Sequence, residues 1–115
     1  MPRLPNAERA VVEIAKLRDY CLNPEHEEGK HKARVFAAAL GFTLENAEML
    51  RDSLLTAAAS EDARFGKMTS HGQLYVIDAV LHGPAGEAAV RSAWILELGT
   101  DFPRLVSCYV RGKRK

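Results

Sequence analysis

The hydrophobic pattern of this chain changes its period near residue 62, and that change constrains the fold more than any other feature. Upstream, apolar residues recur at the spacing of one face of an α-helix. Downstream, the segments TSHG, HGPAG and GTDFP supply turn residues between four strand-like runs, at 63–68, 73–81, 87–98 and 104–110. Because helices precede strands, we expect an α+β fold, with N-terminal helices packed on one face of a roughly four-stranded antiparallel meander.

The helical half begins with a short helix that a proline ends. Residues 15–22 have apolar side chains at helical spacing, and Pro24 stops the helix that they predict. The preceding residues, 10–14, are open to two interpretations, a short strand or the lead-in to this helix.

Two longer helices are expected after this one. The first begins after Gly29 and runs to about Leu40, with Gly41 as its C-cap. The second follows Thr43, which has the side chain of an N-cap, and ends near Ala59. The apolar stripe of the second helix has the 3.6-residue spacing of a buried face. It comprises Leu44, Ala47, Leu50, Leu54, Leu55 and Ala58.

The length and charge of the chain bound its organisation. Its 115 residues are enough for one domain with one core. We expect a flexible arm over 1–9, a single α+β domain over 10–111 and a basic tail over 112–115. The formal net charge of +1 gives no global field that attracts nucleic acid, so such binding requires a local cluster of cations.

The sequence also indicates a compartment. The N-terminus lacks the apolar segment of a signal peptide, and no run approaches the roughly 18 apolar residues of a membrane span. Cys21 and Cys108 have no metal-ligand spacing, and each lies in an apolar segment, where cysteine packs as a small buried hydrophobe. We therefore expect a cytoplasmic protein that contacts no membrane and needs no cofactor.

Alternation within the strands sorts side chains onto two faces of the sheet. In the third strand Arg91 and Glu97 should point away from the helices. The more apolar set of that strand should face them: Val90, Ser92, Trp94 and Leu96. In the last strand, strict alternation places Leu105, Ser107 and Tyr109 on one face. Neither face is fully polar, so the outer face is expected to form a groove or a contact between two copies.

A lysine lies where the helix after Gly29 should bury apolar side chains. At about 100° per residue, Lys32 falls at the centre of the expected buried stripe. That stripe comprises Val35, Phe36, Ala39 and Leu40. In one interpretation the lysine stem lies on apolar surface and the amine reaches solvent past the edge of the core. In the other, the amine emerges at the mouth of a cleft and meets a phosphate as a fixed charge.

Two histidines lie near the start of this helix, and both precede the lysine in the chain. His26 and His31 are residues of the type that serves as general acid or base near neutral pH, although either can equally be a solvated loop residue. A base, an acid and a cation are what metal-free RNA cleavage requires, because the cation stabilises the charged phosphorane. The histidines and acids of 25–31 match no zinc signature, so we predict no metal site.

Two segments resemble a bacterial domain family of uncharacterised function, whose members occur as small stand-alone proteins and as C-terminal modules of polymorphic toxins. They are KLRDYCLNPEHEEGKHKARVFAAALGF, from Lys16, and PRLVSCYV, from Pro103. The resemblance covers about residues 15–110. Its pattern falls on Lys16, Leu17, Tyr20, Asn23, Pro24, His26, Gly29, Lys32, Ala33, Phe36, Trp94, Pro103, Leu105, Val106 and Ser107.

The layout is also similar to the barnase/EndoU/colicin/RelE-like group of metal-independent ribonucleases, in which helices precede a four-stranded antiparallel sheet. This resemblance implies an active site on the sheet, built from an early histidine or lysine and a late serine or threonine. The chain has SCYV where we expect TAYP after the last strand. The implied catalytic residues are His26, Lys32 and Ser107, with Arg91, Arg104 and Tyr109 binding the substrate.

These observations favour a small toxin-type ribonuclease that acts on RNA and has a cognate immunity or antitoxin protein. A different class stays open, a non-catalytic interaction module that binds a small partner or a second copy as a homodimer. Such a module would use the outer sheet face or an exposed edge strand. A metal enzyme is a third class, kept because histidines and acids crowd one loop.

Overall fold

The computed structural model describes residues 3–27 and 30–113. Glu28 and Gly29, and the last two residues of the expected basic tail, lie outside the described residues. Short helices and two longer ones precede four strands, which confirms the predicted α+β fold. The elements are the 3-10 turns η1 (Ala7–Arg9) and η3 (Leu44–Asn46), the π-helical turn η2 (Leu17–Cys21), the helices α1 (Ile14–Lys16), α2 (Lys30–Leu40) and α3 (Ala47–Ser60), and the strands β1 (Arg64–Thr69), β2 (Gly72–Gly83), β3 (Gly86–Glu97) and β4 (Arg104–Lys113).

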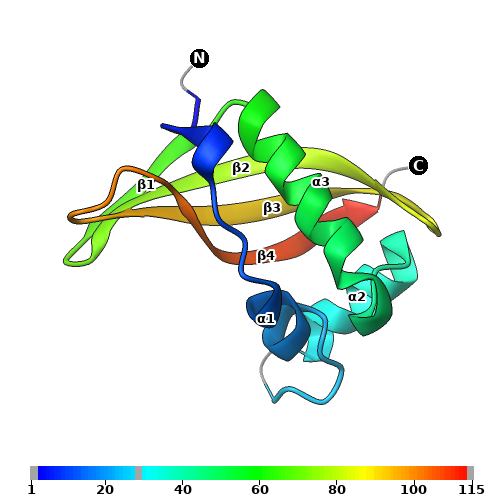
Figure 1. The fold of residues 1–115 in the computed structure, drawn as a ribbon. Helices are drawn as coiled ribbons and strands as arrows, with labels where there is room; N and C mark the ends of the chain where they lie inside the picture. Colours follow the sequence, from blue (N-terminus) through cyan, green and yellow to red (C-terminus); the bar gives the residue numbers. More distant parts are fainter. Residues whose placement is uncertain (1–2, 28–29, 114–115) are drawn as a thin grey trace.

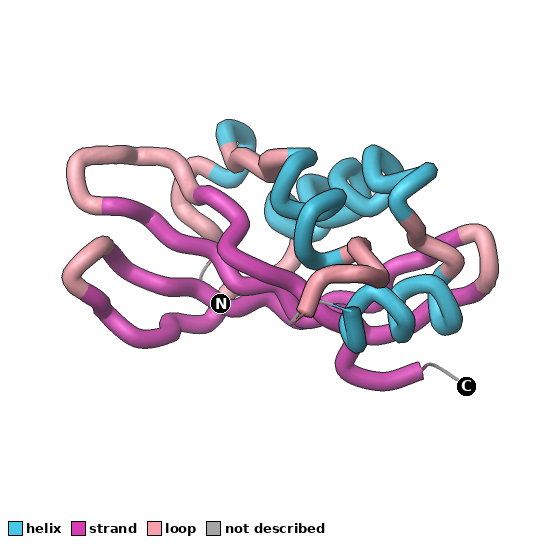
Figure 2. The backbone as a smooth tube through the Cα atoms, turned by 90° about the horizontal axis from the view of Figure 1, so that it is seen from below, coloured by secondary structure: helices cyan, strands magenta, loops and turns pink. Residues whose placement is uncertain are grey.

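The strands form one antiparallel sheet in the order β1-β2-β3-β4, so each strand pairs with its neighbour in the chain. The helices lie on one face, and the β1–β2 and β3–β4 turns project beyond them (Figure 1). The view in Figure 2 shows most of the helical layer above the strands, while the helix that follows the grey residues 28–29 overlaps the strands. This meander leaves β1 and β4 as the edges of the sheet.

The caps of the two longer helices follow the predicted residues. Gly41 has φ +80° after Leu40, a conformation that costs glycine little, and it ends α2. Thr43 accepts a hydrogen bond from the Glu45 N–H at 3.3 Å, and the Asn46 side chain accepts one from the Thr43 N–H at 2.7 Å. This capping box begins the third helix as a 3-10 turn, and α3 proper starts at Ala47.

The buried stripe of α2 differs from the predicted one. Val35 was expected in the core, but 43% of its surface is exposed, whereas Ala33 is buried. The reason is the position of α2 at the edge of the sheet, where Val35 lines a shallow hollow with Tyr109 and Val110 of β4. Leu44, expected in the stripe of the next helix, is likewise 39% exposed, in the 3-10 turn.

The inner face of β3 carries the core as predicted. Val90, Ser92 and Trp94 are buried, and Trp94 is fully so. The Trp94 Nε1–H donates to the Ser92 Oγ at 2.9 Å, and this hydroxyl donates to the Ile77 carbonyl at 3.4 Å. Ser92, the one buried polar side chain among the described residues, therefore has partners on both sides.

A bulge corrects the predicted faces of β4. Ala93 pairs with Ser107 and Trp94 pairs with Leu105, so Val106 is the extra residue between them. Leu105 turns into the core and is 1% exposed. The prediction that Leu105 shares a face with Ser107 is therefore wrong, because strict alternation fails at a bulge. Ser107 and Tyr109 share one face, as expected, and it is the outer face of the sheet.

The N-terminal segment lies against the start of β4. The Val11 N–H donates to the Pro103 carbonyl and the Leu105 N–H donates to the Val11 carbonyl, each at 2.9 Å. This single parallel bridge leads into α1, so residues 10–14 are a lead-in to the helix and not a strand. Among the described residues, no helix has the length and apolarity that crossing a membrane requires.

Candidate functional site

The amine of Lys32 lies between two phenol rings. Lys32 is in the first turn of α2 and is half-buried. Its Nζ donates a hydrogen bond to the Tyr20 Oη at 3.1 Å and lies 4.8 Å from the centre of that ring. The same Nζ is 5.7 Å from the centre of the Tyr109 ring on β4. Cation–π attraction to both rings and one hydrogen bond therefore fix the charge at the β4 edge.

Tyr20 connects this lysine to the first histidine. Its ring and that of His26 meet edge to face with centroids 4.8 Å apart. The half-buried His26 thus lies beside the phenol that Lys32 contacts. Sequence reasoning assigned Tyr20 to an apolar helix face and gave it no role at the site. The sequence feature that could have pointed to such a role is the hydroxyl group of Tyr20, in an otherwise apolar helical stripe.

Two hollows lie beside the hydrogen-bonded pair of Lys32 and Tyr20. One, of about 310 Å³, is lined by His31, Lys32, Val35, Tyr109 and Val110. The other, of about 560 Å³, is lined by Glu13, Ala15, Lys16, Asp19, Tyr20, Val106 and Ser107. The structure therefore brings His31, Lys32 and Tyr109 to one hollow, and places Ser107 in a second hollow, which Tyr20 also lines.

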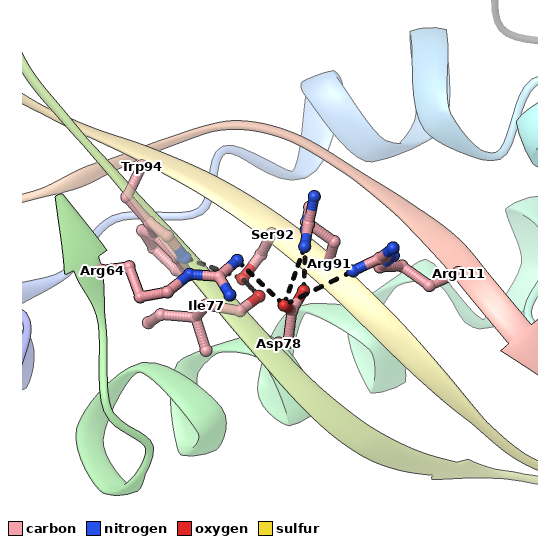
Figure 3. Close-up of polar contacts among 7 residues, drawn as sticks. All are labelled: Arg64, Ile77, Asp78, Arg91, Ser92, Trp94 and Arg111. Atoms are coloured by element: carbon pink, nitrogen blue, oxygen red, sulfur yellow. Dashed lines mark hydrogen bonds and ion pairs between the residues drawn. The ribbon is translucent and has the colours of Figure 1, made fainter. Parts of the chain in front are cut away.

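Arg91 reaches the site from the outer face of the sheet. It is the cross-strand neighbour of Asp78 on β2 and of Tyr109 on β4. Its Nε and Nη2 donate to the Asp78 carboxylate at 2.8 and 2.9 Å (Figure 3). The pKa of Arg91 is raised first by its hydrogen bonds to Asp78 and further by one to Tyr109, while burial acts in the opposite direction.

Asp78 is the centre of a larger cluster that sequence reasoning missed. The Arg64 Nη2 lies 3.0 Å from its Oδ2, and the Arg111 Nη1 lies 3.7 Å from the same oxygen. The hydrogen bond from Arg91, with smaller contributions from the other two arginines, holds the pKa of Asp78 below its ordinary value. The sequence feature that could have predicted this cluster is Asp78 itself, a single acid inside the apolar run VIDAVL.

Arg104 is placed apart from the other predicted substrate-binding residues. It lies at the start of β4, where its Nη1 is 3.1 Å from Glu13 and its Nε is 3.5 Å from Glu97. Both contacts are with carboxylates, so its charge is compensated within the protein.

The two cysteines lie in the core, Cys21 at the end of η2 and Cys108 in β4. Both are free and fully buried, as predicted for small hydrophobic residues. A hydrogen bond with Cys108 lowers the pKa of Cys21 to about 7, and Lys32 adds to this effect. The same interaction, with burial, raises the pKa of Cys108. Among the described residues, His, Cys, Asp and Glu side chains form no group of three that could hold a metal ion.

This arrangement offers groups for acid–base chemistry on an anion. Lys32 supplies a fixed positive charge, His26 and His31 supply imidazoles, and Tyr20 and Tyr109 supply phenols. A fixed cation stabilises negative charge that develops on a bound phosphate. The groups come from three separate elements, η2, α2 and β4, and from the loop that follows η2.

Comparisons with known proteins place this chain in a family. No curated protein matches it. A chain in a solved structure, a contact-dependent growth inhibition toxin–immunity protein complex from Klebsiella pneumoniae 342, has a TM-score of 0.64 at 12% identity. The match covers 88% of this chain and 99% of that chain, and at this identity it concerns the fold alone. The model of a domain family of unknown function, DUF6883, matches residues 3–112, and the chain therefore belongs to that family.

Proposed function

We propose that this protein is a metal-independent ribonuclease of the toxin type. The observation that carries the proposal is the position of the Lys32 amine. Tyr20 and Tyr109 hold this amine at a hollow that His31 also lines. A lysine so placed costs the helix an apolar contact, and a phosphate in the hollow accounts for its position.

The chemistry follows from these groups. A base takes the proton from a 2′-hydroxyl, whose oxygen attacks the adjacent phosphorus. Lys32 stabilises the negative charge on the phosphorane. An acid gives a proton to the departing 5′ oxygen, and a 2′,3′-cyclic phosphate remains.

We assign the acid and base to His26, which lies against Tyr20, and His31, which lines the same hollow as Lys32. Ser107, in the neighbouring hollow, donates a hydrogen bond to the next nucleotide. Arg91 and Tyr109 hold the phosphate from the sheet side. Arg104 has the smallest role, because two carboxylates already compensate it.

A solved structure with this fold supports a place for this protein in a toxin–immunity pair. That structure is a complex of a contact-dependent growth inhibition toxin and an immunity protein. By analogy, this chain acts on RNA in bacterial cytoplasm and has a small immunity or antitoxin protein as partner.

The test is cleavage of RNA by purified protein. We expect the wild-type protein to cleave a single-stranded RNA and Lys32→Ala to lose about 100-fold or more in rate, as when one transition-state contact is removed. Lys30→Ala is the matched control, because Lys30 lies in the same helix but lines a different hollow. RNA left intact by the wild-type protein, together with unaffected growth on expression, contradicts the proposal.

A second candidate function is a non-catalytic interaction module. Phe65 and Met68 of the edge strand β1 are 69% and 68% exposed, which is typical of a strand that meets another chain. Size-exclusion chromatography with light scattering tests it. A homodimer or a stable complex with a neighbouring gene's product supports this function, and a strict monomer with no partner contradicts it.

A further inference from the structure

The outer face of the sheet gathers three arginines around one carboxylate, and each of the four strands contributes one residue (Figure 3). Arg91 of β3 holds Asp78 of β2 through two hydrogen bonds. Arg64 of β1 donates to the same carboxylate at 3.0 Å. Arg111 of β4 lies 3.7 Å away, beyond hydrogen-bond distance.

This cluster has more positive charge than Asp78 can compensate. One carboxylate against three guanidinium groups leaves an excess of two positive charges. Each guanidinium has five N–H donors, so most donors of the cluster make no bond to Asp78. The side chains of Arg64 and Arg111 are 57% and 48% exposed, so their donors face solvent.

The other acids of the sheet do not neutralise this excess. Strands β1 and β4 contain no acidic residue. The remaining acids of β2 and β3 are Glu87, which pairs with His82 at 3.0 Å, and Glu97, which pairs with Arg104 at 3.5 Å. Like charges on one sheet face repel each other. A bound anion would offset the repulsion among these arginines and so stabilise the cluster.

The cluster is continuous with the Lys32 hollow. Arg91 pairs across strands with Tyr109, whose ring lies 5.7 Å from the Lys32 amine. A row of cations thus crosses the sheet from Arg64 on one edge strand to Lys32 beside the other. With neighbouring strands about 4.8 Å apart, the part of the row from β1 to β4 spans roughly 14 Å, the width of a few nucleotides.

We propose that this row binds the phosphate backbone of a single RNA strand and guides it to Lys32, an inference that rests on the proposed function. Arginine suits this role because its planar fork matches phosphate oxygens. One row of cations contacts one backbone, which favours a single strand over a duplex. Tyr109 is the one aromatic residue on the outer face of the described strands, so contacts are with phosphates and confer little sequence preference.

The experiment measures binding of a fluorescently labelled RNA strand whose 2′-hydroxyls are methylated, so that it cannot be cleaved. Anisotropy at several salt concentrations gives the slope of log K against log[salt]. Arg64→Ala and Arg111→Ala should each reduce that slope by about 0.7, the value for one phosphate contact on a single strand. Arg51→Ala is the control, because Arg51 also pairs with an acid, Asp52, but lies on α3.

The outcomes separate this inference from the proposed function. Unchanged slopes in both arginine variants overturn the row of phosphate contacts, even if the wild-type protein cleaves ordinary RNA. If both variants show the expected slopes but the wild-type protein does not cleave ordinary RNA, the row of phosphate contacts is supported and the proposed ribonuclease activity is contradicted. A duplex that binds as tightly as the single strand, with the same loss in both variants, contradicts the single-strand assignment.

Discussion

Two consecutive cross-strand pairs of β2 and β3 show how differently the two faces of this sheet treat polar groups. Ile77 pairs with Ser92 on the inner face, and Asp78 pairs with Arg91 on the outer face. Ser92 is 2% exposed, and its hydroxyl both accepts from Trp94 and donates to Ile77. Asp78 has three cationic partners on a half-exposed surface.

The difference concerns what the polar groups can still bind. On the inner face the buried hydroxyl finds its partners within the core, so its role is structural. On the outer face donors outnumber acceptors, so the surface is suited to an anion from outside. Substitutions on the inner face should therefore change the free energy of unfolding, and those on the outer face should change mainly RNA binding.

The largest expected effect is on the inner face. Trp94→Ala should lower the free energy of unfolding by about 3–5 kcal/mol, because it leaves a cavity and removes the donor to Ser92. Denaturation in urea measures this loss. A loss below about 1 kcal/mol, a value typical of exposed positions, would show that this face is not the core.

A smaller effect on stability, with an opposite effect on binding, is expected at the outer pair. Asp78→Asn should cost about 1 kcal/mol, because partly exposed ion pairs contribute little and the amide oxygen still accepts from Arg91. The same change should tighten RNA binding, because the row gains a net positive charge. Weaker RNA binding in this variant would contradict the comparison.

The contribution of Asp78 should also depend on pH. Its pKa is lowered in the folded protein, chiefly by Arg91, so its ionised form stabilises the fold. That stability is present above the unfolded pKa of about 3.9 and is lost as pH falls through the lower folded value. The gap in melting temperature between wild type and Asp78→Asn should be constant above about pH 4 and narrow below it. A gap that widens with acid would show the opposite sign.

The smallest effect on stability is expected at Arg111. Arg111→Ala should change the free energy of unfolding by less than about 0.5 kcal/mol, because its contact with Asp78 is long and its side chain is half-exposed. Thermal unfolding measures this change. A loss above about 1 kcal/mol would mean that the outer cluster stabilises the sheet itself, which contradicts its assignment to a ligand.

The layers of the fold could be predicted from the sequence because helix ends and turns depend on residues that are close together in the chain. Gly41 and Thr43 mark helix ends by their own chemistry, and turn residues separate the strands. The burial of Ser92 and Trp94 followed from alternation on one strand. Leu105 was misplaced, because a bulge depends on how two strands pair and not on either strand alone.

The candidate site was predictable only in part. Lys32 drew attention because a charge interrupts an apolar helix face, but its partner Tyr20 comes from another element, 12 residues away in the chain. The meeting of Asp78 and Arg91 depends on the register of β2 and β3, which one sequence does not specify. Long-range register and packing, not residue type, decide which predicted residues share a hollow.

The most direct test of the central claim uses the Lys32 amine, the cation to which both the hollow and the row of arginines lead. Purified wild-type protein, Lys32→Ala and Lys30→Ala would be incubated with the same single-stranded RNA, and the products analysed for 2′,3′-cyclic phosphate ends. We expect such ends from the wild type and Lys30→Ala and almost none from a folded Lys32→Ala variant. Equal cleavage by all three proteins, or no cleavage by the wild type, would contradict the claim.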